Sequence, residues 1–141
     1  MIKSNPVTGV GLGAFETAYP IYTRSDGSLL VSQAHNDYLQ ILADCGVIGG
    51  GLAIWFIAAT LAAVLRGLKS RDRLVRGLSL GSGAGIIAML VHSAFDFNLQ
   101  ITSNALMFLL LTSVAYNAAT SRDDNSRQAS DQFRPLADDI I

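Results

Sequence analysis

The sequence has little cysteine and little charge. Cys45 is the only cysteine among the 141 residues, so no intrachain disulfide can form and the redox compartment stays open. Only 15% of the residues are charged, whereas 50% are hydrophobic. Residues 1–24 lack a basic region followed by an apolar core, so we expect no secretory signal there. Because the apolar residues are clustered, too few polar residues remain to cover a soluble core, and we expect a membrane protein.

Three apolar runs carry this expectation. The first, Gly46 to Leu65, has twenty residues without a charged side chain, enough at about 1.5 Å per residue to cross a hydrocarbon core of roughly 30 Å. The second, 77–95, contains one ionisable residue, His92. The third, 101–119, is less apolar, and its central part also fits a buried core helix or a re-entrant segment. We therefore expect an all-α polytopic membrane protein with about three transmembrane helices.

The distribution of charge orients these spans. Residues 66–76 hold five basic residues and one acid, and short loops this basic remain in the cytoplasm. Residues 1–45 hold two basic and four acidic residues, so we place this segment on the opposite side of the membrane. Residues 120–141 have the composition of a disordered, solvated tail on the cytoplasmic side. The basic loop lacks interleaved aromatic residues, and we expect no nucleic-acid partner.

A glycine-rich stretch follows the turn signal Asn5-Pro6. Gly9, Gly11 and Gly13 alternate with apolar residues, and the amides of such a flexible loop could approach an anion. The spacing is not that of a dinucleotide-binding loop, and no lysine follows as in a P-loop. The alternative is a turn that packs tightly against the membrane face, which the pattern alone favours.

A histidine precedes the first apolar run by eleven positions. Asp37 and Gln40 have the spacing of a capping box, which predicts a helix that begins at Asp37, two residues after His35. The positive end of a helix attracts phosphate and disfavours the imidazolium, and a neutral imidazole is what a general base requires. The alternative is that His35 only forms hydrogen bonds within the loop, and spacing alone favours it.

A second histidine and an acid lie near the end of the second run. His92 and Asp96 have i, i+4 spacing, which places them on one helix face. Ionisable groups at membrane depth are usually functional or paired, so this pair either contacts substrate or forms a structural link. No pair of candidate ligands has zinc spacing, and we expect no metal site. Gly77, Gly81 and Gly85 recur every four residues and share one helix face, which predicts close approach of a neighbouring helix.

Three of these segments together resemble one family. His35-Asn36, followed after nine residues by Gly46 and after two more by Gly49, resembles the signature of the O-antigen ligase and O-antigen polymerase superfamily. Residues 5–16 are similar to a glycine-rich segment of that family's large periplasmic loop. Residues 92–101 are similar to a His-Ser-x-x-Asp-x-x-Leu stretch of many members. The motifs occur in the family's order and cover about residues 4–119.

The resemblance implies a multi-pass glycosyltransferase of the bacterial inner membrane that works on the periplasmic face, where residues 1–45 would lie. Such enzymes transfer or polymerise glycan from an undecaprenyl-pyrophosphate carrier. The acceptor is a hydroxyl of lipid A-core, of another glycan or of a protein, and no metal or other cofactor takes part.

The resemblance also assigns roles to residues. His35 is the position that would activate or align the acceptor, and Asn36 would orient it through a hydrogen bond. The expected substrate contacts are Asn36, Gly9, Gly11, Gly13, His92 and Asp96.

The match further implies that the chain is the carboxyl-terminal part of a longer enzyme. The arginines that hold the pyrophosphate in the family lie mostly upstream of the matching segment. We therefore expect the chain to be inactive alone. The competing class is a non-enzymatic membrane protein, such as a transporter fragment, with a polar path at His92 and Asp96.

Overall fold

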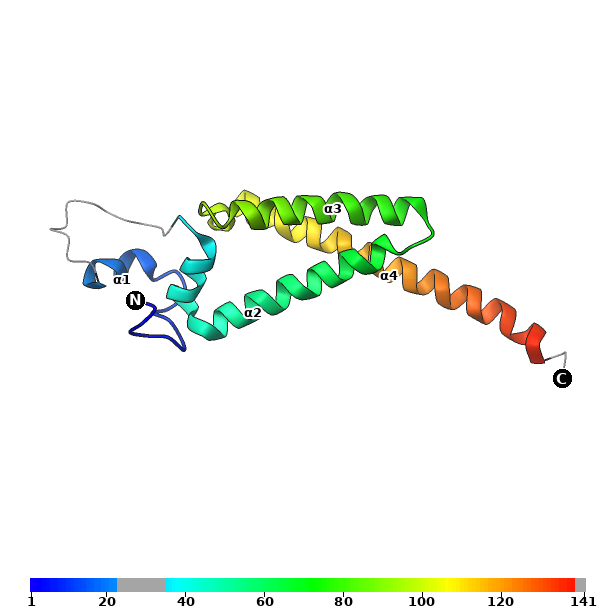
Figure 1. Cartoon of the computed structure of the whole chain (residues 1–141), viewed down its shortest axis with the longest axis horizontal. Helices are drawn as coiled ribbons and strands as arrows, with labels where there is room; N and C mark the ends of the chain where they lie inside the picture. Colours follow the sequence, from blue (N-terminus) through cyan, green and yellow to red (C-terminus); the bar gives the residue numbers. More distant parts are fainter. Residues whose placement is uncertain (23–34, 139–141) are drawn as a thin grey trace. The chain divides into compact units, whose positions relative to one another are not determined.

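The computed structural model describes residues 1–22 and 35–138, with side chains as far as Ser121. The described residues form helices and no strand, which confirms the all-α fold class. The elements are α1 (Phe15–Tyr22), α2 (Asp37–Leu68), α3 (Arg73–His92), the short 3-10 helix η1 (Asn98–Gln100) and α4 (Thr102–Asp138) (Figure 1).

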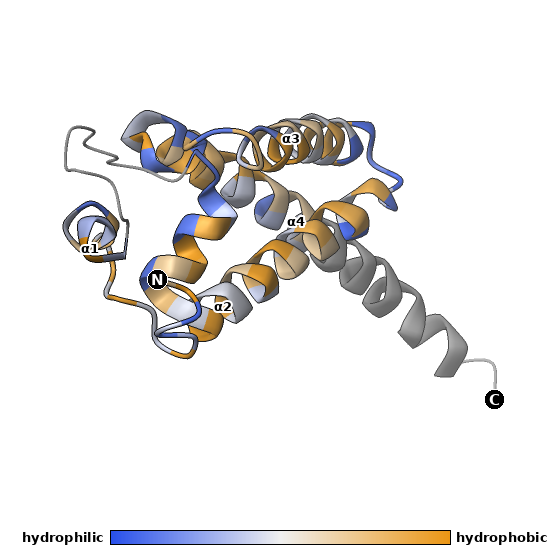
Figure 2. Cartoon of the chain, turned by 60° about the vertical axis from the view of Figure 1, so that its left-hand side comes forward, coloured by the Kyte–Doolittle hydropathy of each residue, from blue (hydrophilic) through white to orange (hydrophobic). Residues whose placement is uncertain are grey.

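Two of the described helices, α2 and α3, are long and apolar enough to cross a membrane. The first expected span, 46–65, lies inside α2, and most of the α2 ribbon has the colour of hydrophobic residues (Figure 2). Most of the second expected span lies in α3, which ends at His92. The third, 101–119, falls in α4, which is not among the two. A third span therefore stays a prediction.

Helix α2 contains a sharp kink at Gly46. This residue has φ 62° and ψ −160°, a conformation that is essentially restricted to glycine. A Cβ atom here would overlap the backbone carbonyl of Val7. The kink separates a short first segment, 37–45, from the apolar remainder of the helix (Figure 1). The expected helix start at Asp37 is confirmed, and the apolar run begins at the kink.

Helix α4 is longer than the sequence predicted. It continues to Asp138, whereas we expected the span to end at Ala119 and a disordered tail to follow over 120–141. No glycine lies between Ala119 and Asp138, and the only proline there, Pro135, comes late. Extending an existing helix adds one hydrogen bond per residue and needs no new nucleus, so polar composition alone did not fix its end.

The chain divides into two compact units. The first comprises residues 1–58 and 87–108, and it contains every expected site residue. The second comprises 59–86 and 109–141. Its helices approach one another at Gly83, where a Cβ would lie 2.6 Å from Val64 Cγ1. They also approach at Gly85, where a Cβ would lie 2.8 Å from Leu111 Cδ1.

The glycine face predicted at Gly77, Gly81 and Gly85 is therefore only partly present. A Cβ at Gly77 or Gly81 would meet no described atom within 4 Å. Close packing is provided by Gly83 and Gly85, two positions apart, because α3 is in contact with different helices on two sides.

Candidate functional site

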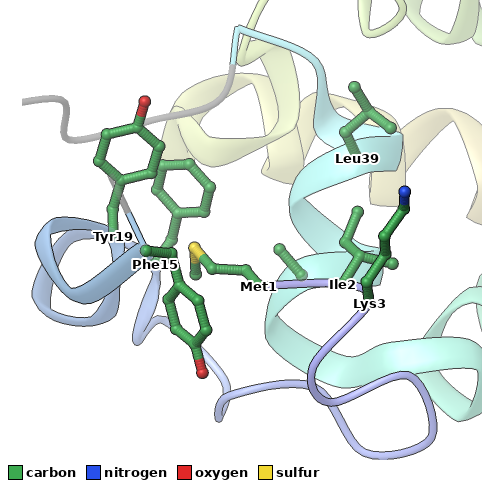
Figure 3. Close-up of a pocket in the computed structure, with 8 residues that line it drawn as sticks. Met1, Ile2, Lys3, Phe15, Tyr19 and Leu39 are labelled. Carbon is green, nitrogen blue, oxygen red and sulfur yellow. The ribbon is translucent and has the colours of Figure 1, made fainter. Parts of the chain in front are cut away.

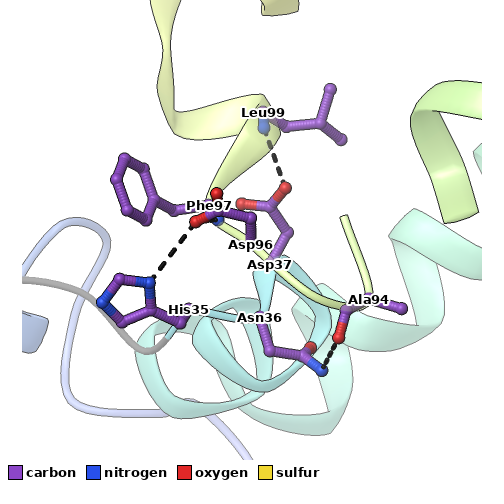
Figure 4. Close-up of polar contacts among 7 residues, drawn as sticks. All are labelled: His35, Asn36, Asp37, Ala94, Asp96, Phe97 and Leu99. Atoms are coloured by element: carbon purple, nitrogen blue, oxygen red, sulfur yellow. Dashed lines mark hydrogen bonds and ion pairs between the residues drawn. The ribbon is translucent and has the colours of Figure 1, made fainter. Parts of the chain in front are cut away.

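The first turn of α2 is capped by Asn36. Its side-chain Oδ1 accepts a hydrogen bond of 3.0 Å from the Leu39 amide, the geometry of a helix N-cap. Its Nδ2 donates a bond of 2.8 Å to the carbonyl of Ala94 (Figure 4). The capping box expected from Asp37 and Gln40 is thus replaced by an Asn36 cap. The hydrogen bonds that the structure gives the Asn36 side chain go to Leu39 and Ala94, and not to His35 as expected.

The neighbouring residues bind the same region of the chain. Asp37 is 1% exposed, and its Oδ2 accepts a bond of 2.8 Å from the Leu99 amide. Its own amide donates to the Ser93 carbonyl at 3.0 Å, and the Tyr38 hydroxyl donates to the Leu90 carbonyl at 2.7 Å. The start of α2 is therefore attached to the end of α3 and to η1. The structure thus brings together two of the sequence motifs, 35–49 and 92–101.

His35 lies at the edge of this junction. Its side chain is 72% exposed, and its backbone has a positive φ of 47°, which is uncommon for a residue other than glycine. Nδ1 lies 3.4 Å from Oδ1 of Asp96, and the ring packs edge-on against Phe97 with centroids 5.2 Å apart. The other ring nitrogen points away from Asp96 (Figure 4). One nitrogen is thus held by the protein while the other is open to solvent.

Asp96 holds the imidazole from the connection that follows α3. Its Oδ1 also accepts a bond of 2.8 Å from the Phe97 amide. That amide, followed by the His35 ring, holds the pKa of Asp96 below its ordinary value. The sequence placed Asp96 on one face with His92, but the structure pairs its carboxylate with His35. The backbone keeps the i, i+4 relation, since the Asp96 amide donates to the His92 carbonyl at 3.1 Å, but the Asp96 side chain turns to His35.

The glycine loop packs on α2 beside the kink. Gly9, Gly11 and Gly13 all have positive φ values, of 70°, 120° and 74°. The Gly9 amide donates to the Asn5 carbonyl at 3.1 Å, and the Gly11 amide to the Asp44 carbonyl at 2.9 Å. The Gly13 amide donates to the Asp44 carboxylate at 3.2 Å. An anion would have to displace these hydrogen bonds, so the loop has the geometry of a tight turn. Contact between these glycines and substrate stays a prediction.

Asp44 is a residue that sequence reasoning missed. It is 7% exposed, and its carboxylate accepts bonds from the amides of Gly13 and Phe15 at the start of α1. It therefore fixes the glycine loop and α1 against α2. The available signal was an acid within the apolar side of a predicted helix, because such a group has to find donors when it is buried.

A cavity of this unit lies elsewhere. It has a volume of about 400 Å³. Aromatic side chains of α1 face the first turns of α2 across it (Figure 3). Its lining residues are Met1, Ile2, Lys3, Phe15, Tyr19, Tyr22, Leu39 and Ala43. None of the expected site residues is among them, so the cavity is separate from the histidine site.

The His35–Asp96 pair has the geometry of a histidine general base paired with a carboxylate. A carboxylate that accepts from Nδ1–H selects the tautomer with a free Nε2, which can take a proton from a hydroxyl. Among residues 1–22 and 35–121, no group of three or more His, Cys, Asp or Glu side chains could hold a metal ion. His92 is exposed. Its charge is the smallest of the effects that lower the pKa of Asp96.

Comparison with known proteins agrees with the sequence motifs. The family model of the O-antigen ligase matches residues 1–56. This range contains the glycine loop, His35-Asn36, and the pair Gly46 and Gly49. Neither a curated protein nor a solved structure matches the chain. This match confirms the resemblance found in the sequence: over residues 1–56 the chain is similar to the O-antigen ligase family.

Proposed function

We propose that the chain forms the acceptor-activating part of a membrane glycosyltransferase. This enzyme transfers or polymerises glycan from an undecaprenyl-pyrophosphate carrier on the periplasmic face of the bacterial inner membrane. The observation that carries the proposal is the pair formed by His35 Nδ1 and Asp96 Oδ1, 3.4 Å apart. The pair joins the segment matched by the family model to a second motif 61 residues along the chain.

The proposed chemistry needs a base for a hydroxyl. With Nδ1–H directed at Asp96, Nε2 of His35 accepts the proton of the acceptor hydroxyl as its oxygen attacks the anomeric carbon. The bond from that carbon to the carrier's pyrophosphate breaks, and the electron pair leaves with the pyrophosphate. Asp96 stabilises the imidazolium that forms. A side chain that is 72% exposed can be reached by acceptors as different as lipid A-core, a glycan and a protein.

The membrane setting supports this arrangement. Helices α2 and α3 have the length and composition of membrane spans. His35 precedes one of them, and Asp96 follows the other. If both helices cross a membrane, the order along the sequence puts both residues on one side of it. The basic residues of 66–76, which come between the two spans in the sequence, then fall on the other side, which favours a periplasmic site. A lipid carrier would deliver its headgroup at this depth.

The transporter alternative is less well supported. It needs His92 and Asp96 along a polar path in mid-membrane, but Asp96 follows the end of α3 and its side chain is 46% exposed. Cysteines at 92 and 96 should react with membrane-impermeant reagents from the periplasmic side. Reaction from the cytoplasmic side alone would contradict the proposed orientation.

The decisive experiment replaces His35 in the longer enzyme that the resemblance implies. His35→Ala should reduce glycan transfer by about 10²–10⁴-fold, the usual contribution of a general base. The amount of inserted protein, measured in isolated membranes, should not change. Asp96→Asn should reduce transfer less, because the base remains while its positioning is lost. If His35→Ala transferred glycan at the wild-type rate, His35 would not be the general base.

A further inference from the structure

The connection between α2 and α3 carries a concentrated positive charge. We call residues 66–76 the basic hairpin; it appears as a blue connection in Figure 2. Its five cations are all exposed: Arg66, Lys69, Arg71, Arg73 and Arg76. The single acid, Asp72, accepts a bond of 2.8 Å from the Leu74 amide at the start of α3. Within the described part of the chain, none of the five cations forms an ion pair.

The hairpin is an ordered turn. The buried residue Ser70 donates its amide to the Gly67 carbonyl at 3.0 Å, and its Oγ accepts from the Asp72 amide at 3.2 Å. Gly67 lies directly against Ser79 of α3, where any Cβ would overlap the serine side chain. The backbone that carries the cations is therefore fixed before any ligand binds, which lowers the entropic cost of binding.

Exposed apolar side chains lie next to these cations in both helices. Leu65 is 59% exposed near the end of α2, while Leu74 and Leu78 are 69% and 45% exposed in the first turns of α3. Both helices are long enough to cross a membrane, so the leucines and the cations together lie at the boundary between acyl chains and headgroups. There the long basic side chains can extend toward the headgroups.

We propose that the basic hairpin binds the phosphate groups of anionic phospholipids. Arginine guanidinium groups match a phosphate with two parallel hydrogen bonds, and the adjacent leucines contact the acyl chains of the same lipid. The hairpin contains no aromatic residue on which a base could stack, which favours lipid over single-stranded nucleic acid. This inference requires only that the chain crosses a membrane, so it is independent of glycan transfer.

Native mass spectrometry of the full chain in a neutral detergent tests the proposal. Phosphatidylglycerol and phosphatidylcholine with identical acyl chains are offered at equal concentration, and the ratio of bound lipids is measured. The wild-type chain should retain phosphatidylglycerol preferentially. The triple variant R71Q/R73Q/R76Q should lose roughly fivefold in this ratio for each cation removed, with helicity by circular dichroism unchanged. If the triple variant loses helicity, the single variant Arg73→Gln provides the measurement.

Two further arms make the test specific. The triple variant R122Q/R127Q/R134Q removes the same charge from the end of α4 and should keep the wild-type preference. If it loses the preference equally, or if the wild-type chain binds both lipids alike, the hairpin site is wrong. Inorganic phosphate added in excess should not displace the lipid. Full displacement would assign the site to a soluble anion and overturn the lipid proposal.

Discussion

The amide of Leu99 donates a hydrogen bond of 2.8 Å to Oδ2 of Asp37, 62 residues away in the sequence. Asp37 is 1% exposed, so water does not compete for this bond. The bond joins the first residue of α2 to η1, and Asp96 lies in the connection that leads to η1. The carboxylate therefore holds the segment that carries Asp96 against the helix that follows His35.

Replacing Asp37 tests this role. Asp37→Ala leaves the part-buried Leu99 amide without its acceptor and should lower the free energy of unfolding by about 1 kcal/mol. Asp37→Asn keeps an oxygen for that amide and should lose less. Denaturant unfolding in detergent, followed by circular dichroism, measures both. Equal losses for the two variants would show that the charge, and not the acceptor, is what stabilises the junction.

The sequence predicted this region in part. Helix capping is a local interaction, so the start of α2 at Asp37 could be foreseen. The residue that caps the helix could not be foreseen from the sequence. The Asp37 carboxylate accepts a bond from the Leu99 amide, and Asn36 accepts the bond from the Leu39 amide instead. The His35–Asp96 pair has a separation of 61 residues. Local spacing instead favoured His92 with Asp96; the Asp96 amide does bond the His92 carbonyl, but the Asp96 carboxylate pairs with His35.

The kink in α2 also depends on a contact between residues far apart in the sequence. The apolar run from Gly46 to Leu65 correctly indicated a membrane-length helix, since composition and length decide that property. The non-helical Gly46 depends on the packing of residues 7–9 against it, and no pattern along the chain encodes that contact. The glycine loop forms the tight turn that the pattern alone favoured, its contact with substrate stays a prediction, and Asp44 as its anchor was missed.

The His35–Asp96 pair should depend on pH through the carboxylate. The Phe97 amide and the His35 ring lower the pKa of Asp96 from an unfolded value of about 3.9. The folded state therefore binds the proton less tightly. The stabilisation is fully present above the unfolded pKa and is lost as the pH falls through the folded value. Titration of the Asp96 ¹³Cγ resonance by NMR, assigned with Asp96→Asn, should give a midpoint below that of an ordinary aspartate.

His35→Ala provides the control for this titration. It should raise the Asp96 midpoint only partway, because the bond of 2.8 Å from the Phe97 amide remains. A midpoint at the ordinary value in the wild-type chain would contradict the geometry at Asp96.

Gly46 should tolerate no side chain. Its backbone, with φ 62° and ψ −160°, costs an L-residue about 1–3 kcal/mol, and a Cβ would also overlap the Val7 carbonyl. Gly46→Ala should therefore lower the midpoint of thermal unfolding in detergent. Gly51→Ala is the matched control in the same helix, since nothing lies within 4 Å of its Cβ position. It should be neutral or should stabilise by up to about 1 kcal/mol. Equal behaviour of the two variants would rule out a required kink.

Gly83 should be sensitive to its contact with Val64. In Gly83→Ala the new methyl group would lie 2.6 Å from Val64 Cγ1, and such overpacking costs about 1–3 kcal/mol. Gly81→Ala, with open space around its Cβ position, should cost nothing measurable. The double variant Gly83→Ala/Val64→Ala should recover most of the loss, because the shortened side chain makes room for the methyl group. Thermal unfolding of the four chains gives the coupling energy directly. Strictly additive losses would mean that α3 does not approach Val64 at this position.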